Sequence, residues 1–235
     1  MASALRITAL AIAAPVFLAC SSEPLTELPG ESGAAPTGTA SAPSPPPTTS
    51  SDDYVLTEYP PGPYGRGVGS VIENLEFLGW HDPVAAGYDP ANFEVVRLSD
   101  FYDPTGEDIK LIVLNASAVW CTVCRAEYRH FAEQAIHATY RPKGVQLIGA
   151  LFEDNAAGPA KPEDLAEWGR SPQFAVEFPM VLDPGFKLGR YFASDVTPLN
   201  LIIDARTMKI VNVTMGYDPS DTSTYWLYVD SLLPR

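Results

Sequence analysis

Two continuous apolar runs on either side of a helix-like segment constrain the fold of this chain more than any other feature. Residues 110–117 (KLIVLNAS) and 145–152 (VQLIGALF) lack the alternation of a half-exposed strand, which predicts two strands buried on both faces. Between them, 122–140 predicts a helix that stops before Pro142. This order predicts a parallel strand pair joined by a right-handed crossover. The apolar positions at helical spacing are Phe131, Ala135, Ile136 and Tyr140.

Further elements extend this unit in both directions. The pattern predicts strands at 75–78, 93–98, 199–204 and 210–214, the last two forming a hairpin, and helices at 99–102, 164–169, 186–192 and 221–233. The last helix places Tyr225, Val229, Leu232 and Leu233 on one face. We therefore expect an α/β fold with a mixed central sheet flanked by helices and an N-terminal β extension.

The first twenty residues have the composition of an export signal. Arg6 precedes an apolar run from Ile7 to Leu18 that is too short to span a bilayer. The following Ala19-Cys20 resembles a bacterial lipobox, in which cleavage after residue 19 leaves Cys20 as a lipidated N-terminus. A cysteine lying by chance in an ordinary cleaved signal is the alternative.

Residues 20–55 are dominated by Ser, Thr, Pro, Gly and Ala and contain Pro45-Pro46-Pro47. Such a segment buries too little apolar surface to offset the entropy of ordering, so we expect a disordered tether between the membrane and a folded domain at 56–235.

The chain is strongly acidic, with 29 Asp and Glu against 15 Lys and Arg and a formal charge of -14. This charge argues against nucleic acid as a partner and against electrostatic docking on anionic lipid, since both are polyanionic. We expect a soluble monomeric domain whose membrane contact is the lipid on Cys20.

The chain has three cysteines, an odd number for an exported protein. Assigning Cys20 to lipid leaves Cys121 and Cys124 as a pair. They flank Thr122-Val123 where a buried strand meets a long helix. Free N–H groups and the dipole at a helix N-terminus stabilise a thiolate, so we expect a lowered pKa for Cys121. Cys121 would attack a partner disulfide, Cys124 would resolve the mixed disulfide, and Trp120 would shield the pair.

Other uses of a CxxC pair fit less well. A zinc site needs four ligands, and only His81, His130 and His137 are available besides the pair. Haem attachment needs His directly after the second cysteine, where Arg125 stands. A purely structural disulfide would close too short a loop to stabilise the fold much. We expect neither a metal nor a cofactor.

A second element supports redox exchange. Thr197-Pro198 directly precedes the strand expected at 199–204. An X–Pro bond at the start of a strand is a position where a cis peptide can persist. We predict that this proline is cis and packs against the dithiol, with Thr197 offering its backbone to an extended substrate.

From about residue 67 to 216 the chain resembles the redoxin branch of the thioredoxin superfamily, especially TlpA-like extracytoplasmic thiol-disulfide oxidoreductases. The residues that carry the resemblance are Asn115, Trp120, Cys121, Cys124, Arg125, Glu127, Phe178-Pro179, Asp183, Thr197-Pro198, Ile203-Asp204 and Gly216. The resemblance implies a thioredoxin-like fold, Cys121 as nucleophile and Cys124 as resolver. It also implies protein thiols and disulfides as partners and an upstream membrane reductant.

The resemblance leaves the proton acceptor open. Asn115 stands where cytoplasmic thioredoxins carry a buried acid. Glu127 is a candidate acid–base group, with a solvated first-turn glutamate as the equal alternative. The Thr122-Val123 spacer differs from the proline-containing spacers usual in this branch, so reducing and oxidising roles are not separated. Arg129 replaces the usual kinking proline, which predicts a straighter helix.

We predict an extracytoplasmic, lipid-anchored thiol-disulfide oxidoreductase, working as a reductase. The first alternative is a thiol peroxidase, whose Pro-x-x-x-Thr-x-x-Cys motif is not met, because Ala118 and Cys121 stand three before the two cysteines. The second is a copper-binding thioredoxin-like chaperone, which uses a distal histidine, but no histidine follows His137.

Overall fold

The computed structural model of the chain describes residues 58–220 and 222–233. The signal peptide, the lipidated Cys20 and the tether expected at 20–55 lie outside these residues and stay predictions. Within the described part, no helix is both long enough and apolar enough to cross a membrane.

A seven-stranded mixed sheet forms the centre of the domain, in the order β2-β1-β5-β4-β3-β6-β7. β3 and β4 are parallel, as are β4 and β5, whereas the β1–β2 and β6–β7 pairs are antiparallel. This confirms the predicted mixed sheet and its N-terminal β extension. The strands are β1 Glu76–Trp80, β2 Glu94–Arg97, β3 Leu111–Ala118, β4 Val145–Glu153, β5 Met180–Leu182, β6 Leu199–Asp204 and β7 Lys209–Met215.

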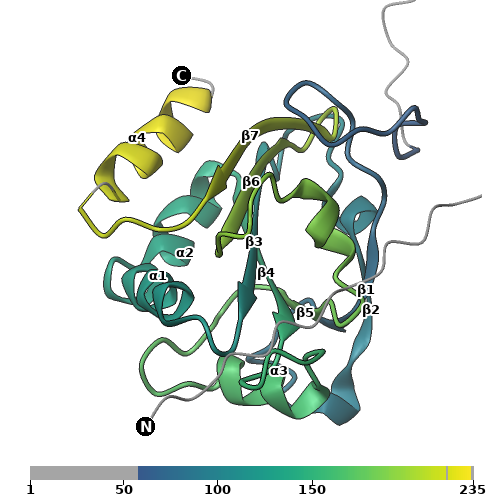
Figure 1. Cartoon of the computed structure of the whole chain (residues 1–235). Coiled ribbons are helices and arrows are strands. Elements are labelled where there is room, and N and C mark those ends of the chain that lie inside the picture. Colours follow the sequence, from purple (N-terminus) through teal and green to yellow (C-terminus); the bar gives the residue numbers. More distant parts are fainter. Residues whose placement is uncertain (1–57, 221, 234–235) are drawn as a thin grey trace, which may run out of the picture. The chain divides into compact units, whose positions relative to one another are not determined.

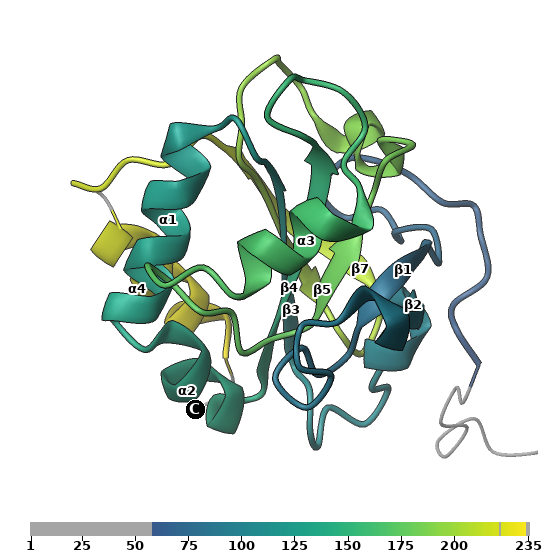
Figure 2. The same cartoon turned by 90° about the horizontal axis from the view of Figure 1, so that it is seen from below.

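Helices cover both faces of this sheet. The α-helices are α1 Thr122–Glu133, α2 Ile136–Tyr140, α3 Pro162–Gly169 and α4 Thr222–Leu232. The 3₁₀ turns are η1 Pro90–Asn92, η2 Leu98–Phe101, η3 Arg141–Lys143 and η4 Lys187–Tyr191. Figures 1 and 2 show α1, α2 and α4 together on one face, with η4 on the opposite face.

The core lies against β3 and β4, as their apolar sequences predict. All eight residues of β3 are buried, and eight of the nine residues of β4 are buried as well. On the helix side, the Tyr128 ring of α1 meets the Trp168 ring of α3 edge-on at 5.1 Å between centroids. Aromatic pairs at this distance add to the stabilisation from apolar burial, so the helix that carries the cysteines is firmly attached.

The prediction of one continuous helix over 122–140 is wrong. It breaks after Glu133, and Ala135 adopts a left-handed conformation (φ 46°) before α2 begins. In a continuous helix Phe131 and Ile136 would point about 140° apart, so both could not face one core. The break turns the chain so that both are buried, whereas Ala135, expected on the apolar face, is exposed.

Other elements differ in detail from those expected. β5 was not predicted, because its three residues are too few to show a period. The short helices expected at 99–102 and 186–192 are the 3₁₀ turns η2 and η4. In α4 the predicted face of Tyr225, Val229, Leu232 and Leu233 packs against the core, together with Trp226, which was not predicted.

The chain before β1 runs beside β7 over residues 69–72. Gly69 N–H donates to the Ile210 carbonyl at 2.8 Å, and Ile210 N–H donates to the Ser70 carbonyl at 2.9 Å. Ile72 N–H then donates to the Met208 carbonyl at 2.9 Å, and the Ile72 side chain is fully buried. This segment is therefore part of the folded domain.

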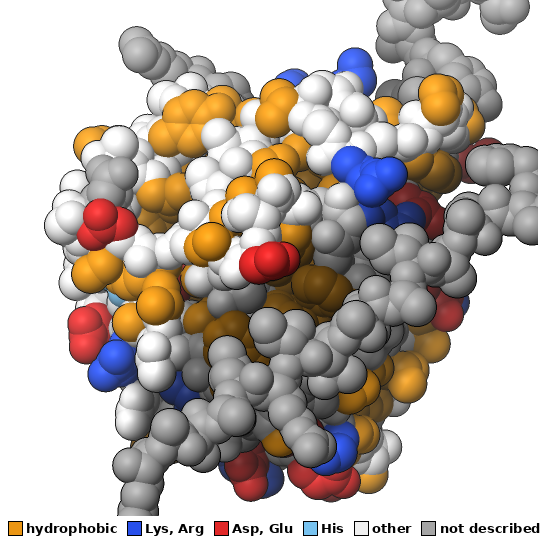
Figure 3. Space-filling model, in the orientation of Figure 1, with side chains coloured by type: hydrophobic (Ala, Val, Ile, Leu, Met, Phe, Trp, Pro, Cys, Tyr) orange, Lys and Arg blue, Asp and Glu red, His pale blue; other side chains and the backbone are white. Residues whose placement is uncertain are grey.

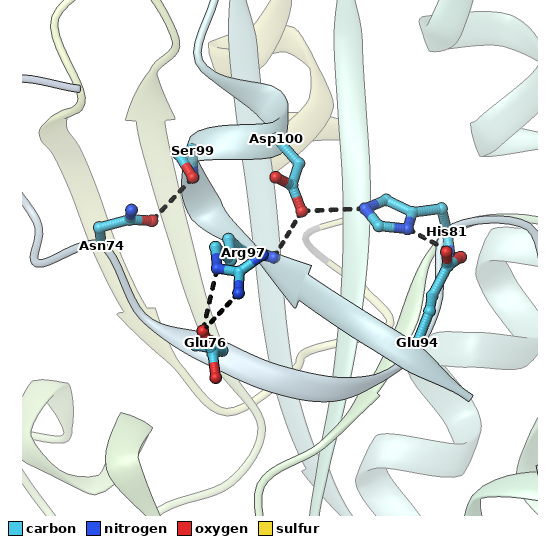
Figure 4. A network of polar contacts seen from close by, with 7 residues as sticks. All are labelled: Asn74, Glu76, His81, Glu94, Arg97, Ser99 and Asp100. Atoms are coloured by element: carbon cyan, nitrogen blue, oxygen red, sulfur yellow. Dashed lines mark hydrogen bonds and ion pairs between the residues drawn. The ribbon is translucent and has the colours of Figure 1, made fainter. Parts of the chain in front are cut away.

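The β1–β2 hairpin carries an exposed polar network, here called the hairpin cluster, shown in Figure 4. His81 bonds the Glu94 carboxylate through Nδ1 at 2.8 Å and the Asp100 carboxylate through Nε2 at 3.0 Å. Arg97 pairs with Glu76 across the hairpin at 2.9 Å. The cluster consists of Asn74, Glu76, His81, Glu94, Arg97, Ser99 and Asp100.

Candidate active site

The predicted cysteine pair lies where β3 ends and α1 begins. Cys121 and Cys124 form a disulfide. Cys121 is the N-cap residue of α1, and its Sγ accepts the backbone N–H of Cys124 at 3.0 Å. A sulfur at this position meets the free N–H groups and the positive end of the helix dipole, both of which favour a thiolate. The geometry predicted for the pair is therefore present.

Thr197 and Pro198 lie against this disulfide, on the loop before β6. The Thr197–Pro198 peptide bond is cis. Thr197 Oγ1 lies 3.1 Å from Cys121 Sγ, within hydrogen-bonding reach of sulfur. Two segments separated by 76 positions in the sequence thus meet at one sulfur atom.

The rim of the site is apolar and exposed. Trp120 is 43% exposed, and its indole Nε1–H donates to Glu153 Oε2 at 2.7 Å, which fixes the ring beside the disulfide. Val123 on α1 and Val196 before the cis-proline are also exposed. The disulfide itself is buried, with Cys121 3% and Cys124 0% exposed. A partner would meet a flat apolar surface before it reaches sulfur.

Behind the disulfide lies a buried polar group, here called the buried cluster, which comprises Asn115, Ser117, Glu127 and Asn200. Asn115 and Asn200 are opposite each other on neighbouring strands β3 and β6. Asn115 Nδ2 donates to Glu127 Oε2 at 2.6 Å, and Asn200 Nδ2 donates to Glu127 Oε1 at 2.8 Å. Ser117 completes the cluster by donating to Asn115 Oδ1 at 2.7 Å. Each Glu127 oxygen is therefore held by an amide.

Glu127 is a buried acid and not the solvated glutamate that was the alternative, since it is only 5% exposed. Burial raises the pKa of Glu127 to about 8, against the lowering effect of the Asn200 and Asn115 hydrogen bonds. Its place follows from helical geometry, because residue 127 lies one turn after Cys124 on the face that α1 buries.

Asn200 belongs to the site but was not predicted from the sequence. The signal was present, because an asparagine inside the apolar run of 199–203 (LNLII) must find a hydrogen-bond partner when buried. Asn115 gives the same signal inside β3. Among the described residues, His, Cys, Asp and Glu side chains form no group of three or more that could hold a metal ion.

Comparisons with known proteins support the redoxin resemblance of the chain. A family model described as "AhpC/TSA family" matches residues 85–213. The thiol-disulfide oxidoreductase ResA of Bacillus subtilis (strain 168) is 25% identical over 159 residues, covering 63% of this chain and 78% of ResA.

Solved structures share the thioredoxin-like fold. A Chlorobium tepidum protein assigned as the thiol:disulfide interchange protein DsbE gives a TM-score of 0.55 at 22% identity, covering 72% of this chain and all of that one. A Bacteroides thetaiotaomicron protein assigned as a protein disulfide isomerase gives 0.53 at 24% identity, covering 72% of this chain and 92% of that one. With the family match spanning more than half of its length, this chain belongs to the AhpC/TSA family.

Proposed function

We propose that this thiol-disulfide oxidoreductase is a membrane-tethered, extracytoplasmic reductase of protein disulfides. The observation that carries the proposal is the Cys121–Cys124 disulfide at the N-terminus of α1, with Thr197 Oγ1 on the Cys121 sulfur. ResA, similar over most of its length, bears the name of a thiol-disulfide oxidoreductase.

The two cysteines have different roles in the proposal. Cys121 is the nucleophile, because its sulfur receives the Cys124 N–H and the Thr197 hydroxyl, both of which stabilise a thiolate. Cys124 is fully buried and resolves the mixed disulfide from inside. Trp120 and the Thr197-Pro198 loop form the surface that receives the partner.

Glu127 is the proposed proton acceptor for Cys124. The two residues are three apart on α1, which places them on one face of the helix. A carboxyl with a pKa of about 8 is well matched to a thiol, whose ordinary pKa is about 8.5. Proton transfer between them is therefore nearly balanced in free energy.

The buried carboxyl also favours the reducing direction. A dithiol is a strong oxidant when its thiolate is strongly stabilised, since the reduced form is then favoured. An ionised Glu127 one turn from Cys124 opposes a second negative charge there. Because the pKa of Glu127 is about 8, this effect disfavours the reduced pair, and makes it a better electron donor, chiefly as the pH rises toward 8.

The proposed location outside the cytoplasm rests on the export signal and on Cys20 at its end. The tether at 20–55 would leave the domain free to reach partners near the membrane. Membrane fractionation of Cys20→Ala beside the unchanged protein tests the anchor, because the variant should move to the soluble fraction.

Reduction of an insulin-like substrate tests the activity. Cys121→Ser should lose at least 100-fold in rate, because no thiolate remains to attack. Cys124→Ser should instead accumulate a mixed disulfide with the substrate, visible as a covalent adduct. A Cys121→Ser protein that still reduces the substrate at the original rate would end the proposal.

A further inference from the structure

A cavity of about 330 Å³ lies between α1, β7 and α4, next to the buried cluster. Glu127 and Asn200 line its inner end, whereas Asp218 at its other end is exposed to solvent. Aromatic and hydroxyl-bearing residues form the wall between them. These are Phe131, Thr214, Tyr217, Thr222, Tyr225 and Trp226.

Solvent does not reach Glu127 from the side of the disulfide. Cys124 is completely buried, and Cys121 is only 3% exposed. A carboxyl that takes up a proton at every turnover must also release it, and the cavity gives it a way to the surface. The cavity is polar at both ends and is large enough to hold several water molecules.

The Tyr225 hydroxyl is the unexplained group in this wall. Its oxygen is buried and has no hydrogen-bond partner among the described residues. Leaving a buried hydroxyl unpaired is unfavourable, so a partner within the cavity is expected. Burial and the nearby Glu127 raise the pKa of Tyr225 well above its usual range, which keeps the hydroxyl protonated and able to donate.

Several other groups face Glu127. The Asn115 and Asn200 amides hold its two oxygens, and Cys124 lies one turn before it on α1. Across the cavity are Tyr217 and Asp218. Burial, followed by the charges of Glu127 and Glu133, also raises the pKa of Tyr217, so two neutral hydroxyls line the cavity that the carboxyl shares.

We propose that this cavity is the route by which Glu127 exchanges its proton with solvent, and that the Tyr225 hydroxyl orders the water along it. The inference rests on the proposed role of Glu127 as proton acceptor. Tyr225 is a positioning residue in this scheme, since it acts on water and not on the cysteines.

With a partner held on Cys121, the Cys124 thiol gives its proton to the Glu127 carboxylate, and its sulfur attacks Cys121. The Cys121–Cys124 bond forms, the bond from Cys121 to the partner breaks, and the partner leaves as a thiolate. Glu127 then passes its proton to water in the cavity and regains its charge.

Tyr225→Phe tests the route, with Tyr228→Phe as the matched control. Tyr228 lies on the same helix, is 38% exposed and does not line the cavity. Figure 3 shows that the surface over α4 is mostly uncharged, so neither change disturbs a charged patch. Because the Tyr225 hydroxyl has no protein partner, Tyr225→Phe should fold as well as the unchanged protein.

The measurement is the rate at which the reduced protein resolves a mixed disulfide, followed by stopped flow from pH 6 to 9 at rising imidazole concentration. Tyr225→Phe should resolve it about 3- to 10-fold more slowly near neutral pH, and imidazole should restore the rate, since a small base can replace ordered water. Tyr228→Phe should match the unchanged protein at every concentration.

Two results would overturn the inference: an unchanged rate in Tyr225→Phe, or a slower rate that imidazole does not restore, which indicates a structural effect. Both leave the proposed function intact as long as Cys121→Ser is inactive. Conversely, an active Cys121→Ser protein removes the proposed function itself, whatever Tyr225→Phe does.

Discussion

The buried cluster and the hairpin cluster each hold a glutamate carboxylate, one in the core and one on the surface. In each, a carboxylate is held by side chains from neighbouring elements. Glu127 accepts two amide hydrogen bonds at 5% exposure, and its pKa is raised to about 8 because burial outweighs those bonds. Glu94 is exposed, and the hydrogen bond from His81 lowers its pKa.

The comparison shows that hydrogen bonding alone does not set the direction of a pKa shift. In both clusters the bonds favour the charged carboxylate, and only the loss of water in the buried cluster reverses the outcome. The partners differ as well. Neutral amides hold Glu127, whereas ionisable His81 and two carboxylates share charge on the surface. The pKa of the carboxyl is therefore raised where its partners are neutral and buried, and lowered where its partner is ionisable and exposed.

The largest expected effect on the free energy of unfolding comes from replacing the buried Glu127 carboxyl. The raised pKa of Glu127, about 8 against 4.5, means that the folded state holds its proton more tightly than the unfolded state. Its contribution to stability is thus full below about pH 4.5 and is lost as the pH rises to 8. Between pH 4.5 and 8 the free energy of unfolding of Glu127→Gln should therefore fall by about 3–5 kcal/mol less than that of the unchanged protein, as measured by urea unfolding at each pH.

Glu94→Gln is the control on the surface. Because the pKa of Glu94 is lowered, its stabilising effect is present at neutral pH and disappears as the pH falls through its folded pKa. The sign is opposite to that of Glu127. An unfolding profile of Glu127→Gln that keeps the decline of the original protein between pH 4.5 and 8 would contradict the contrast between the clusters.

A smaller effect is expected from removing one asparagine in each cluster. Asn200→Ala takes one donor from Glu127 and should lower the free energy of unfolding by about 2–3 kcal/mol, since a buried carboxyl loses its partner. Asn74→Ala removes only the exposed acceptor of the Ser99 N–H and should cost less than about 0.5 kcal/mol. Equal losses of unfolding free energy in the two variants would show that the burial of a cluster does not determine the cost of removing its asparagine.

The smallest effect is expected at His81. Burial alone would lower its pKa, but hydrogen bonds to Glu94 and Asp100 together raise it above 6.5. Its ion pairs thus stabilise the fold below about pH 6.5 and are lost as the pH rises through the folded pKa. His81→Gln should cost about 0.5 kcal/mol or less at pH 6, because the exposed pairs are screened.

Salt distinguishes this surface effect from the buried one. The His81→Gln difference should fall toward zero in 0.5 M NaCl, whereas the decline that depends on Glu127 should persist. If salt leaves the His81→Gln difference unchanged, the ion pairs of the hairpin cluster are not screened by solvent, and the contrast with the buried cluster is wrong.

Much of the fold could be predicted from the sequence, because its central elements have clear apolar patterns. β3, β4 and the start of α1 follow directly from two apolar runs and the helical spacing between them. The break at Ala135 could not be predicted, since it arises from the need of Phe131 and Ile136 to share one core. That requirement depends on the sheet and is absent from the local sequence.

The site was predictable to the same degree. Cys121, Cys124 and Thr197-Pro198 were found because strand, CxxC and helix are contiguous, and because proline marks the next strand. The depth of Glu127 was not predictable from the local sequence, since a residue in the second turn of a helix can face either solvent or core. Its place one turn after Cys124 and the facing positions of Asn115 and Asn200 on β3 and β6 together decide it.

The segment at 69–72 beside β7 has a consequence for solubility. An unpaired edge of a sheet offers free N–H and C=O groups to any other extended chain, which is a route to aggregation. Here Gly69, Ser70 and Ile72 already occupy those groups at the start of β7. At the opposite edge, β2 is only four residues long and carries Glu94 and Arg97. The covered start of β7 and the short, charged β2 edge therefore both discourage intermolecular strand pairing.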